Sequence, residues 1–346
     1  MPSFRVVLIG WLGVFGFLAM GRNALAVDIP WVTVGDPGNT GDTTRMKQDG
    51  SSGYGTVAYT YLIGKYDVTN AQYAEFLNAK DPDGANMLGL FDSFMNTDAN
   101  TAGISFNPAA SNGGKYGTLA GQANKPIVHV SWYNALRFSN WLNNGQGNGD
   151  TESGAYTLTG GQTPSNANSI TRNAGAKVFL PSENEWYKAA YYKGGGTNAG
   201  YWAFATQHDT APISGPPGSI TANAANYNDK ITGYATTGST GYSTNQKYLT
   251  DVGAYSQSPS AYGTFDQTGN VFQWNEALVS GTGARGIRGG SWNLDDGALP
   301  SLNRDLLYLP NYANFFIGFR VASIPEPTGM IGWVFGAVVL LRRKKN

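Results

Sequence analysis

The stretch Tyr262–Trp292, YGTFDQTGNVFQWNEALVSGTGARGIRGGSW, constrains the fold more than any other part of the chain. It contains two turns, GNVFQW at 269–274 and RGGSW at 288–292, in which small residues stand directly beside large rings. Glycine permits backbone angles that other residues avoid, and tryptophan favours burial. The pattern therefore predicts two sharp turns anchored in an aromatic core.

The first turn also carries oxygen atoms that are spaced for a hard cation. The side-chain oxygens of Asp266 and Gln273 flank the backbone carbonyl groups of Gly269 and Val271. Calcium takes carboxylate, amide and backbone carbonyl oxygens as ligands. We therefore predict a calcium site formed by these four residues.

The composition indicates a loop-rich globular protein with an aromatic core. Glycine accounts for 47 of the 346 residues, aromatic residues for 13% and charged residues for only 13%. This is too aromatic for a disordered chain. No linker or strict internal repeat divides the body, which favours one large domain.

Several classes of function are excluded by what the chain lacks. There is no cysteine, so disulfides, thiolate metal sites and a cysteine nucleophile are excluded. The only histidines are His129 and His208, which excludes a three-histidine zinc site. Six of the 23 basic residues lie near the two ends, so the body is net acidic and has no basic face for nucleic acid.

Both ends of the chain read as targeting signals. Residues 1–26 run from a basic residue through an apolar stretch to Ala24-Leu25-Ala26, the layout of a secretory signal peptide. Residues 324–346 combine Pro-Glu-Pro, an apolar run at 330–341 and a basic end. This order resembles the PEP-CTERM sorting signal of bacterial envelope proteins, which an exosortase recognises in the membrane. The alternative is a short transmembrane anchor that is never processed.

Between these ends, short strands lead into capped helices. Thr69 with Gln72, and Ser182 with Glu185, are spaced as capping boxes, and Ser131 is placed to cap a third helix. His129 precedes that helix with no acidic residue near it in sequence, which favours a structural role over catalysis. Strands are expected at the start of 31–54, within 57–68, 125–130 and 177–181 and, at the centre of a sheet, at 315–321.

Six motifs in a fixed order resemble the formylglycine-generating enzyme, or sulfatase-modifying-factor, domain. They are Tyr66–Tyr73, Pro126–Trp132, Leu180–Trp186, Gly269–Trp274, Arg288–Trp292 and Gly318–Arg320. The resemblance implies that residues 27–323 form one α+β domain with a C-type-lectin-like fold, which is loop-rich with a small central sheet and few helices.

The resemblance does not carry the family's oxidase chemistry with it. Those oxidases convert a sulfatase cysteine to formylglycine with copper held by two of their own cysteines. The matching positions in this chain are Leu294 and Leu299. Leucine cannot ligate copper, so we expect no copper and no catalytic residue.

The resemblance also implies two calcium sites. The first coincides with the site predicted above at Asp266, except that Gln273 stands where the family usually has glutamate. The second would be formed largely by carbonyl groups, from Asn226, Tyr227, Gly253 and Tyr255. The alternative is that these turns are stable without metal, through side-chain hydrogen bonds.

Three functions remain open. The first is a non-enzymatic domain, exported to the cell envelope or beyond, that binds an extracellular glycan or matrix protein. The others are an oxidoreductase of the same family, and an accessory subunit in sulfatase maturation. For the first function we expect the ligand on the segment 293–314, because related folds present a binding face there. The candidate residues are Asp295, Asp296, Arg304, Tyr308 and Tyr312.

Overall fold

The computed structural model describes residues 26–218 and 222–325. The predicted signal peptide and sorting signal therefore lie outside the described residues, apart from residues 26, 324 and 325. The predicted apolar segment 330–341 lies wholly outside them. Within the described residues, no helix is both long enough and apolar enough to cross a bilayer.

Most of the described chain is loop, and its regular elements are short. The α-helices are α1 (Asn70–Lys80), α2 (Phe94–Thr97), α3 (Trp132–Asn143) and α4 (Glu183–Tyr191), and 3₁₀ turns cover Ala167–Ser169 and Asp296–Ala298. The strands are β1 (Trp31–Val34), β2 (Tyr61–Gly64), β3 (Ile104–Phe106), β4 (Tyr116–Thr118), β5 (Val178–Phe179), β6 (Ile213–Ser214), β7 (Ala224–Ala225), β8 (Asn228–Asp229), β9 (Gly233–Tyr234), β10 (Phe272–Leu278), β11 (Arg285–Arg288), β12 (Ile317–Gly318) and β13 (Ala322–Ser323).

The three main helices begin where the capping residues predict. The Thr69 hydroxyl accepts a hydrogen bond from the amide of Gln72, whose side chain accepts one from the amide of Thr69. Ser182 and Glu185 make the same reciprocal pair at the start of α4. Ser131 caps α3. Each cap satisfies backbone N–H groups that lack a partner in the first turn of a helix.

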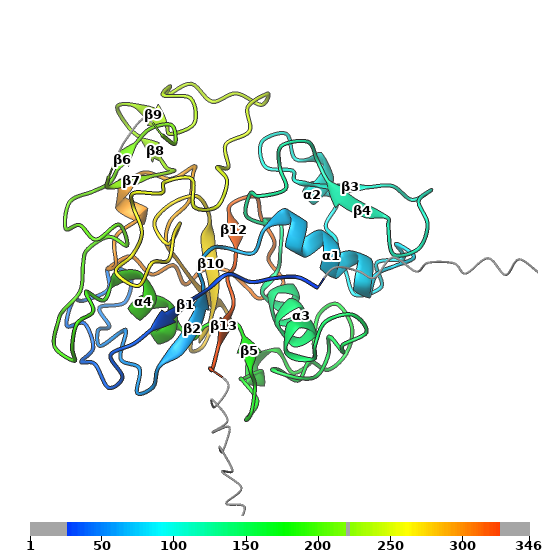
Figure 1. Cartoon of the computed structure of the whole chain (residues 1–346), viewed down its shortest axis with the longest axis horizontal. Helices are drawn as coiled ribbons and strands as arrows, with labels where there is room; N and C mark the ends of the chain where they lie inside the picture. Colours follow the sequence, from blue (N-terminus) through cyan, green and yellow to red (C-terminus); the bar gives the residue numbers. More distant parts are fainter. Residues whose placement is uncertain (1–25, 219–221, 326–346) are drawn as a thin grey trace, which may run out of the picture.

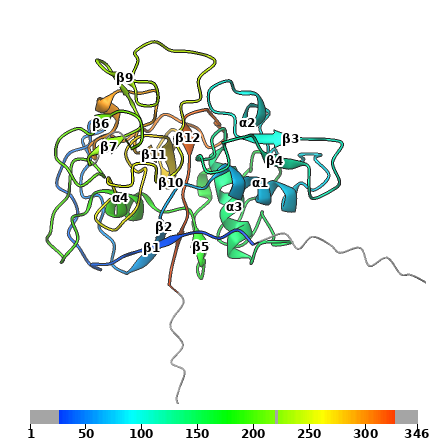
Figure 2. The same ribbon diagram turned by 45° about the horizontal axis from the view of Figure 1, so that its top comes forward.

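Two small sheets form the centre of the molecule. One has the order β1-β2-β13-β5 and is antiparallel throughout. The other has the order β11-β10-β12, in which β10 pairs antiparallel with β11 and parallel with β12. Helices α1 and α3 lie on one side of these strands, and α4 lies on the other side with β6–β9 (Figures 1 and 2).

Two strand predictions were wrong in detail. Residues 315–321 do not form one central strand, because β12 lies at the edge of one sheet and β13 is one of the two interior strands of the other. Between them, the buried Arg320 donates to the carbonyl of Gly64 and leaves the ladder. Residues 125–130 form an isolated bridge between Pro126 and Thr69 but no strand, because the chain leaves extended geometry at His129, which has a left-handed φ of 58°.

The core is aromatic, as the composition predicts. Tyr73, Phe76, Phe138 and Phe319 pack edge-to-face or stacked, with ring centroids 5.3–6.5 Å apart. All four side chains are fully buried. Fully burying a phenylalanine side chain stabilises a fold by roughly 1.5–3 kcal/mol, so these rings contribute strongly to the core.

Candidate functional site

The two glycine turns predicted from the sequence lie against each other. The amide of Gly269 donates to the carbonyl of Gly289 (2.8 Å), and the amide of Trp292 donates to the carbonyl of Asn270 (2.9 Å). Gly269, Asn270 and Gly289 all have left-handed φ angles. These turns therefore form one unit that places Trp274 and Trp292 in the interior.

Asn270 connects this unit to distant loops, a role that the sequence did not predict. Its side-chain oxygen accepts from the side chain of Asn226 (2.9 Å) and from the amide of Thr250 (3.2 Å). Its side-chain nitrogen donates to the carbonyl of Thr250. Because Asn270 is 1% exposed, these bonds form in a poorly solvated interior and hold the 226 and 250 segments in place.

The side chain of Gln273 does not fit the predicted calcium site in this arrangement. Its oxygen accepts hydrogen bonds from Trp186 Nε1 and Arg320 Nε, both at 2.7 Å, and its nitrogen donates to the carbonyl of Asp266. An amide oxygen has two lone pairs, and both are used here. Of the two predicted side-chain ligands of this turn, the oxygen of Gln273 is therefore occupied, and the carboxylate of Asp266 is the one that remains a prediction.

The structure brings residues of the two predicted calcium sites together. Asp266 Oδ2 accepts a hydrogen bond from the amide of Gly253 (2.6 Å), and Asp266 lines a small cavity with Tyr255. Asn226 lies at the Gly269 turn, where its carbonyl accepts from the amide of Asn270. The carbonyl of Tyr227 instead accepts from Ser214 and Ala235. Val271 is fully buried beside the turn.

Asp266 should make stability depend on pH in metal-free protein. Burial raises its pKa from 3.8 to about 6, against the opposing hydrogen bond from Gly253 and charge of Arg320. Because the folded pKa lies above the unfolded one, this group stabilises the native state below about pH 4, and that stabilisation is lost as pH rises through about 6. The full change is at most about 3 kcal/mol.

The measurement is urea unfolding of native protein and Asp266→Asn, both with chelator, at pH 4 and pH 7. The variant should gain stability relative to native protein as pH rises, and parallel profiles would contradict this. Calcium added at pH 7 should stabilise native protein more than the variant if the predicted ion binds Asp266.

The two positions matched to the copper cysteines are part of the packing. Leu299 is fully buried against Phe204, Ala225 and Tyr227. Leu294 packs against the main core. Within residues 26–218 and 222–325, no group of three or more histidine or acidic side chains is arranged to hold a metal ion.

The five predicted ligand residues lie in three different settings. Asp295 caps the 3₁₀ turn that includes the exposed Asp296, and it pairs with Lys230 at 2.7 Å. Tyr308 and Tyr312 stack on each other, with ring centroids 4.8 Å apart. These contacts do not form one binding site.

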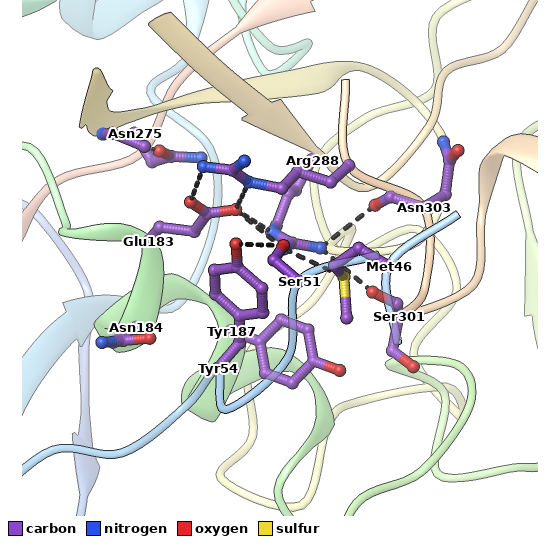
Figure 3. A network of polar contacts seen from close by, with 12 residues as sticks. Met46, Ser51, Tyr54, Glu183, Asn184, Tyr187, Asn275, Arg288, Ser301 and Asn303 are labelled. Carbon is purple, nitrogen blue, oxygen red and sulfur yellow. Dashed lines mark hydrogen bonds and ion pairs between the residues drawn. The ribbon is translucent and has the colours of Figure 1, made fainter. Parts of the chain in front are cut away.

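Arg304, the fifth of these residues, is engaged within the protein. It donates to both oxygens of Glu183 at 2.6 and 2.8 Å, and to Asp49 at 2.8 Å. Glu183 also pairs with the fully buried Arg288, which donates to the carbonyls of Ser301 and Asn303 (Figure 3). We call Glu183, Arg288, Arg304 and Asp49 the arginine network. Its bonds tie α4 to the segment 301–304.

A pocket of about 280 Å³ opens beside the second glycine turn. We call it the aromatic pocket, and it is lined by Asp98, Asn100, Tyr234, Tyr242, Trp292, Asn293 and Phe315. Tyr242 stacks on Tyr248, which stacks on Trp292, with interplanar angles of 8° and 5°. Tyr242 is 56% exposed, so this column of rings runs from the core to the surface.

Some polar side chains of the aromatic pocket make hydrogen bonds within the protein, and others have unused hydrogen-bonding atoms. Asn100 is structural, because its side chain donates to the carbonyls of Ser243 and Gln246 and accepts from Tyr242. In contrast, the side-chain nitrogen of Asn293 and the hydroxyl of Tyr234 make no hydrogen bond within the described part of the chain. The pocket therefore offers both ring surfaces and unused hydrogen-bonding groups.

Sequence reasoning missed most of this pocket. Of the residues that line the pocket, only Asn293 falls within the segment 293–314, where a ligand was expected. The available signal was the recurrence of Tyr234, Tyr242 and Tyr248 in a Gly/Thr-rich loop. Rings in such a loop require a partner surface, but no local pattern identifies it.

Comparisons with known proteins agree with this architecture. Residues 36–324 match the family model described as "Sulfatase-modifying factor enzyme 1-like domain". The crystal structure of CarF is 22% identical, with a TM-score of 0.52, and the alignment covers 86% of this chain and 99% of that one. PvdO from Pseudomonas aeruginosa is 18% identical with a TM-score of 0.43, covering 86% and 92%. No curated protein sequence matches the chain.

At this level of identity, the likeness to CarF concerns the fold alone. That fold, together with the short sheets, few helices and long loops of the described residues, confirms the expected α+β fold of the formylglycine-generating enzyme. The family model covers most of the sequence and contains both glycine turns. The chain therefore belongs to the sulfatase-modifying factor enzyme 1-like domain family.

Proposed function

We propose that this domain is a non-catalytic module that binds an extracellular glycan in the aromatic pocket. The observation that carries the proposal is the stacked column Tyr242–Tyr248–Trp292 at the wall of a pocket with unused polar groups. Ring faces pack well against the apolar face of a sugar, while amide and hydroxyl groups orient its hydroxyls.

A larger cavity is a weaker candidate for this role. It measures about 520 Å³ and lies between the N-terminal segment and the start of α1. Part of its polar lining is used within the protein, because Thr69 and Gln72 form the capping box and one carboxylate oxygen of Asp67 pairs with Arg320. Tyr66 is the only aromatic residue in its lining, so the cavity lacks a pair of stacked rings.

Replacing Tyr242 with alanine should weaken glycan binding about tenfold, which corresponds to about 1.4 kcal/mol. The purified protein would first be screened on an array of neutral, amino and acidic oligosaccharides. The affinity for the best ligand would then be measured by calorimetry. Tyr59→Ala is the matched control, because Tyr59 is also an exposed ring (42%) but hydrogen-bonds Glu185 instead. Equal losses in both variants would contradict the proposed site.

The competing functions predict different outcomes. An oxidoreductase of the family would carry stoichiometric copper and would convert the cysteine of a sulfatase peptide to an aldehyde. We expect neither, because leucines fill the matched positions. An accessory subunit would bind the sulfatase peptide without turning it over, and it would give no signal on the array.

We propose a structural role for calcium, and an exported location. No predicted calcium ligand lines the aromatic pocket, so glycan binding should persist in chelator. The predicted N-terminal signal peptide and the predicted C-terminal sorting signal support export and handling by an exosortase-type enzyme in the membrane. The domain would then meet its glycan at the cell envelope or beyond it.

A further inference from the structure

A second pocket, of about 260 Å³, lies near the aromatic pocket. We call it the polar pocket, and it is lined by Leu88, Gly89, Asp92, His129, Ser131, Tyr133, Asn134, Gln162, Thr163, Asn311 and Ala313. Asn311 and Ala313 belong to the segment where the sequence predicts a binding face. The exposed Thr163 and Asn311 make no side-chain hydrogen bond within the described part of the chain.

A thin wall of side chains separates the two pockets. Asp98 lines the aromatic pocket and His129 lines the polar pocket, with Asp98 Oδ2 only 3.6 Å from His129 Nε2. Thr101 donates to Asp98 and contacts His129 Nε2 at 3.4 Å. Despite its burial, these hydrogen bonds hold the pKa of Asp98 below its usual value. The side chains of this wall are therefore connected to one another by polar contacts.

An exposed ring lies over this wall. Phe94 is 56% exposed, and its ring stacks on that of His129 with centroids 5.6 Å apart and planes 25° apart. Ring surface is thus available at the wall as well as in the aromatic pocket. A ligand that crosses the wall would meet an apolar face there.

Only the two pockets together have the volume that is typical of a small-molecule site. Small-molecule sites measure roughly 300–1,000 Å³, and each pocket alone is smaller than that. Together they fall within this range. We propose that the two pockets are subsites of one extended site for an oligosaccharide of several sugar units. This inference rests on the proposed function and assigns its ligand class.

The chemistry of the lining favours a polyhydroxylated ligand over a peptide. Apart from Asp92, Asp98 and His129, every polar side chain in the two linings is a neutral amide or hydroxyl. Such groups both donate and accept hydrogen bonds, as sugar hydroxyls do. No arginine or lysine lines either pocket, so neither offers a cationic partner for an acidic peptide.

The test is the dependence of affinity on ligand length. Calorimetry would compare a disaccharide and a hexasaccharide of the glycan type that binds best on the array. The native protein should bind the hexasaccharide at least tenfold more tightly. The double variant Thr163→Ala/Asn311→Ala should lose most of that gain and bind the disaccharide unchanged. Thr197→Ala/Asn198→Ala, two exposed residues on a loop that lines neither pocket, is the matched control.

Each other outcome overturns a distinct claim. Binding that is independent of length, and unaffected by the double variant, would restrict the ligand to one pocket and overturn the extended site alone. An array without any bound carbohydrate would overturn the proposed function itself. Binding of an unmodified extended peptide in place of carbohydrate, weakened by Thr163→Ala/Asn311→Ala, would overturn the assigned ligand class.

Discussion

Replacing Glu183 with alanine is expected to lower the free energy of unfolding at pH 7 by about 3–5 kcal/mol. Glu183 accepts hydrogen bonds from Arg288 and Arg304, and its side chain is only 8% exposed. Its removal would leave the fully buried guanidinium of Arg288 without a counter-charge. A buried charge that loses its partner is far costlier than an exposed one, because water cannot replace the lost interaction.

Urea unfolding of native protein and variant measures this loss. The control is Asp251→Ala, which removes a carboxylate that is 53% exposed and pairs with Lys125. Exposed pairs contribute roughly 0–1 kcal/mol, so this change should be small. Equal losses in the two variants would show that the arginine network does not carry the stability assigned to it.

Replacing Gly269 with alanine is expected to cost about 3 kcal/mol, from two additive causes. A left-handed backbone costs a non-glycine residue roughly 1–2 kcal/mol, and Gly269 has a φ of 79°. The added Cβ would also lie 2.4 Å from the carbonyl oxygen of Asn226. That backbone is fixed by its hydrogen bond to Asn270, so overpacking should add roughly 1–3 kcal/mol.

Two other glycines separate these causes. Gly238 has a φ of 60° but open space around its Cβ position, so alanine there should show the backbone cost alone. Gly35 has open space and no left-handed φ, so alanine there should be neutral or slightly stabilising. The unfolding midpoint in urea should be highest for Gly35→Ala, lower for Gly238→Ala and lowest for Gly269→Ala. Any reversal would refute the account of the turn.

The parts of the fold that sequence predicted correctly depend on neighbours within one helical turn. Thr69 with Gln72, and Ser182 with Glu185, are three residues apart, and each pair closes its hydrogen bonds without help from the rest of the chain. The sequence also predicted the family and showed that leucine stands at positions 294 and 299, which match the copper cysteines. The strand at 125–130 failed because the left-handed φ of His129 is not visible in a run of apolar residues.

The candidate site depends instead on contacts between segments that are distant in the sequence. Sequence spacing placed Gln273 beside a cation, but the fold brought Trp186 and Arg320 to its oxygen. It also engaged Arg304 with Glu183, away from the aromatic pocket. In both cases the competing partner comes from a distant segment. The sequence shows which donor and acceptor atoms a residue has, but it does not show which of them remain free in the folded protein.

The sequence by itself determined the family, the capped helices, the two glycine turns and the absence of thiolate chemistry, because these depend on residue identity and short-range geometry. Only the tertiary structure decided where a ligand is expected to bind. The aromatic pocket joins Asp98, Tyr242 and Trp292, which come from separate loops. Their approach depends on long-range packing and on buried amides such as Asn100 and Asn270, whose partners no local pattern specifies.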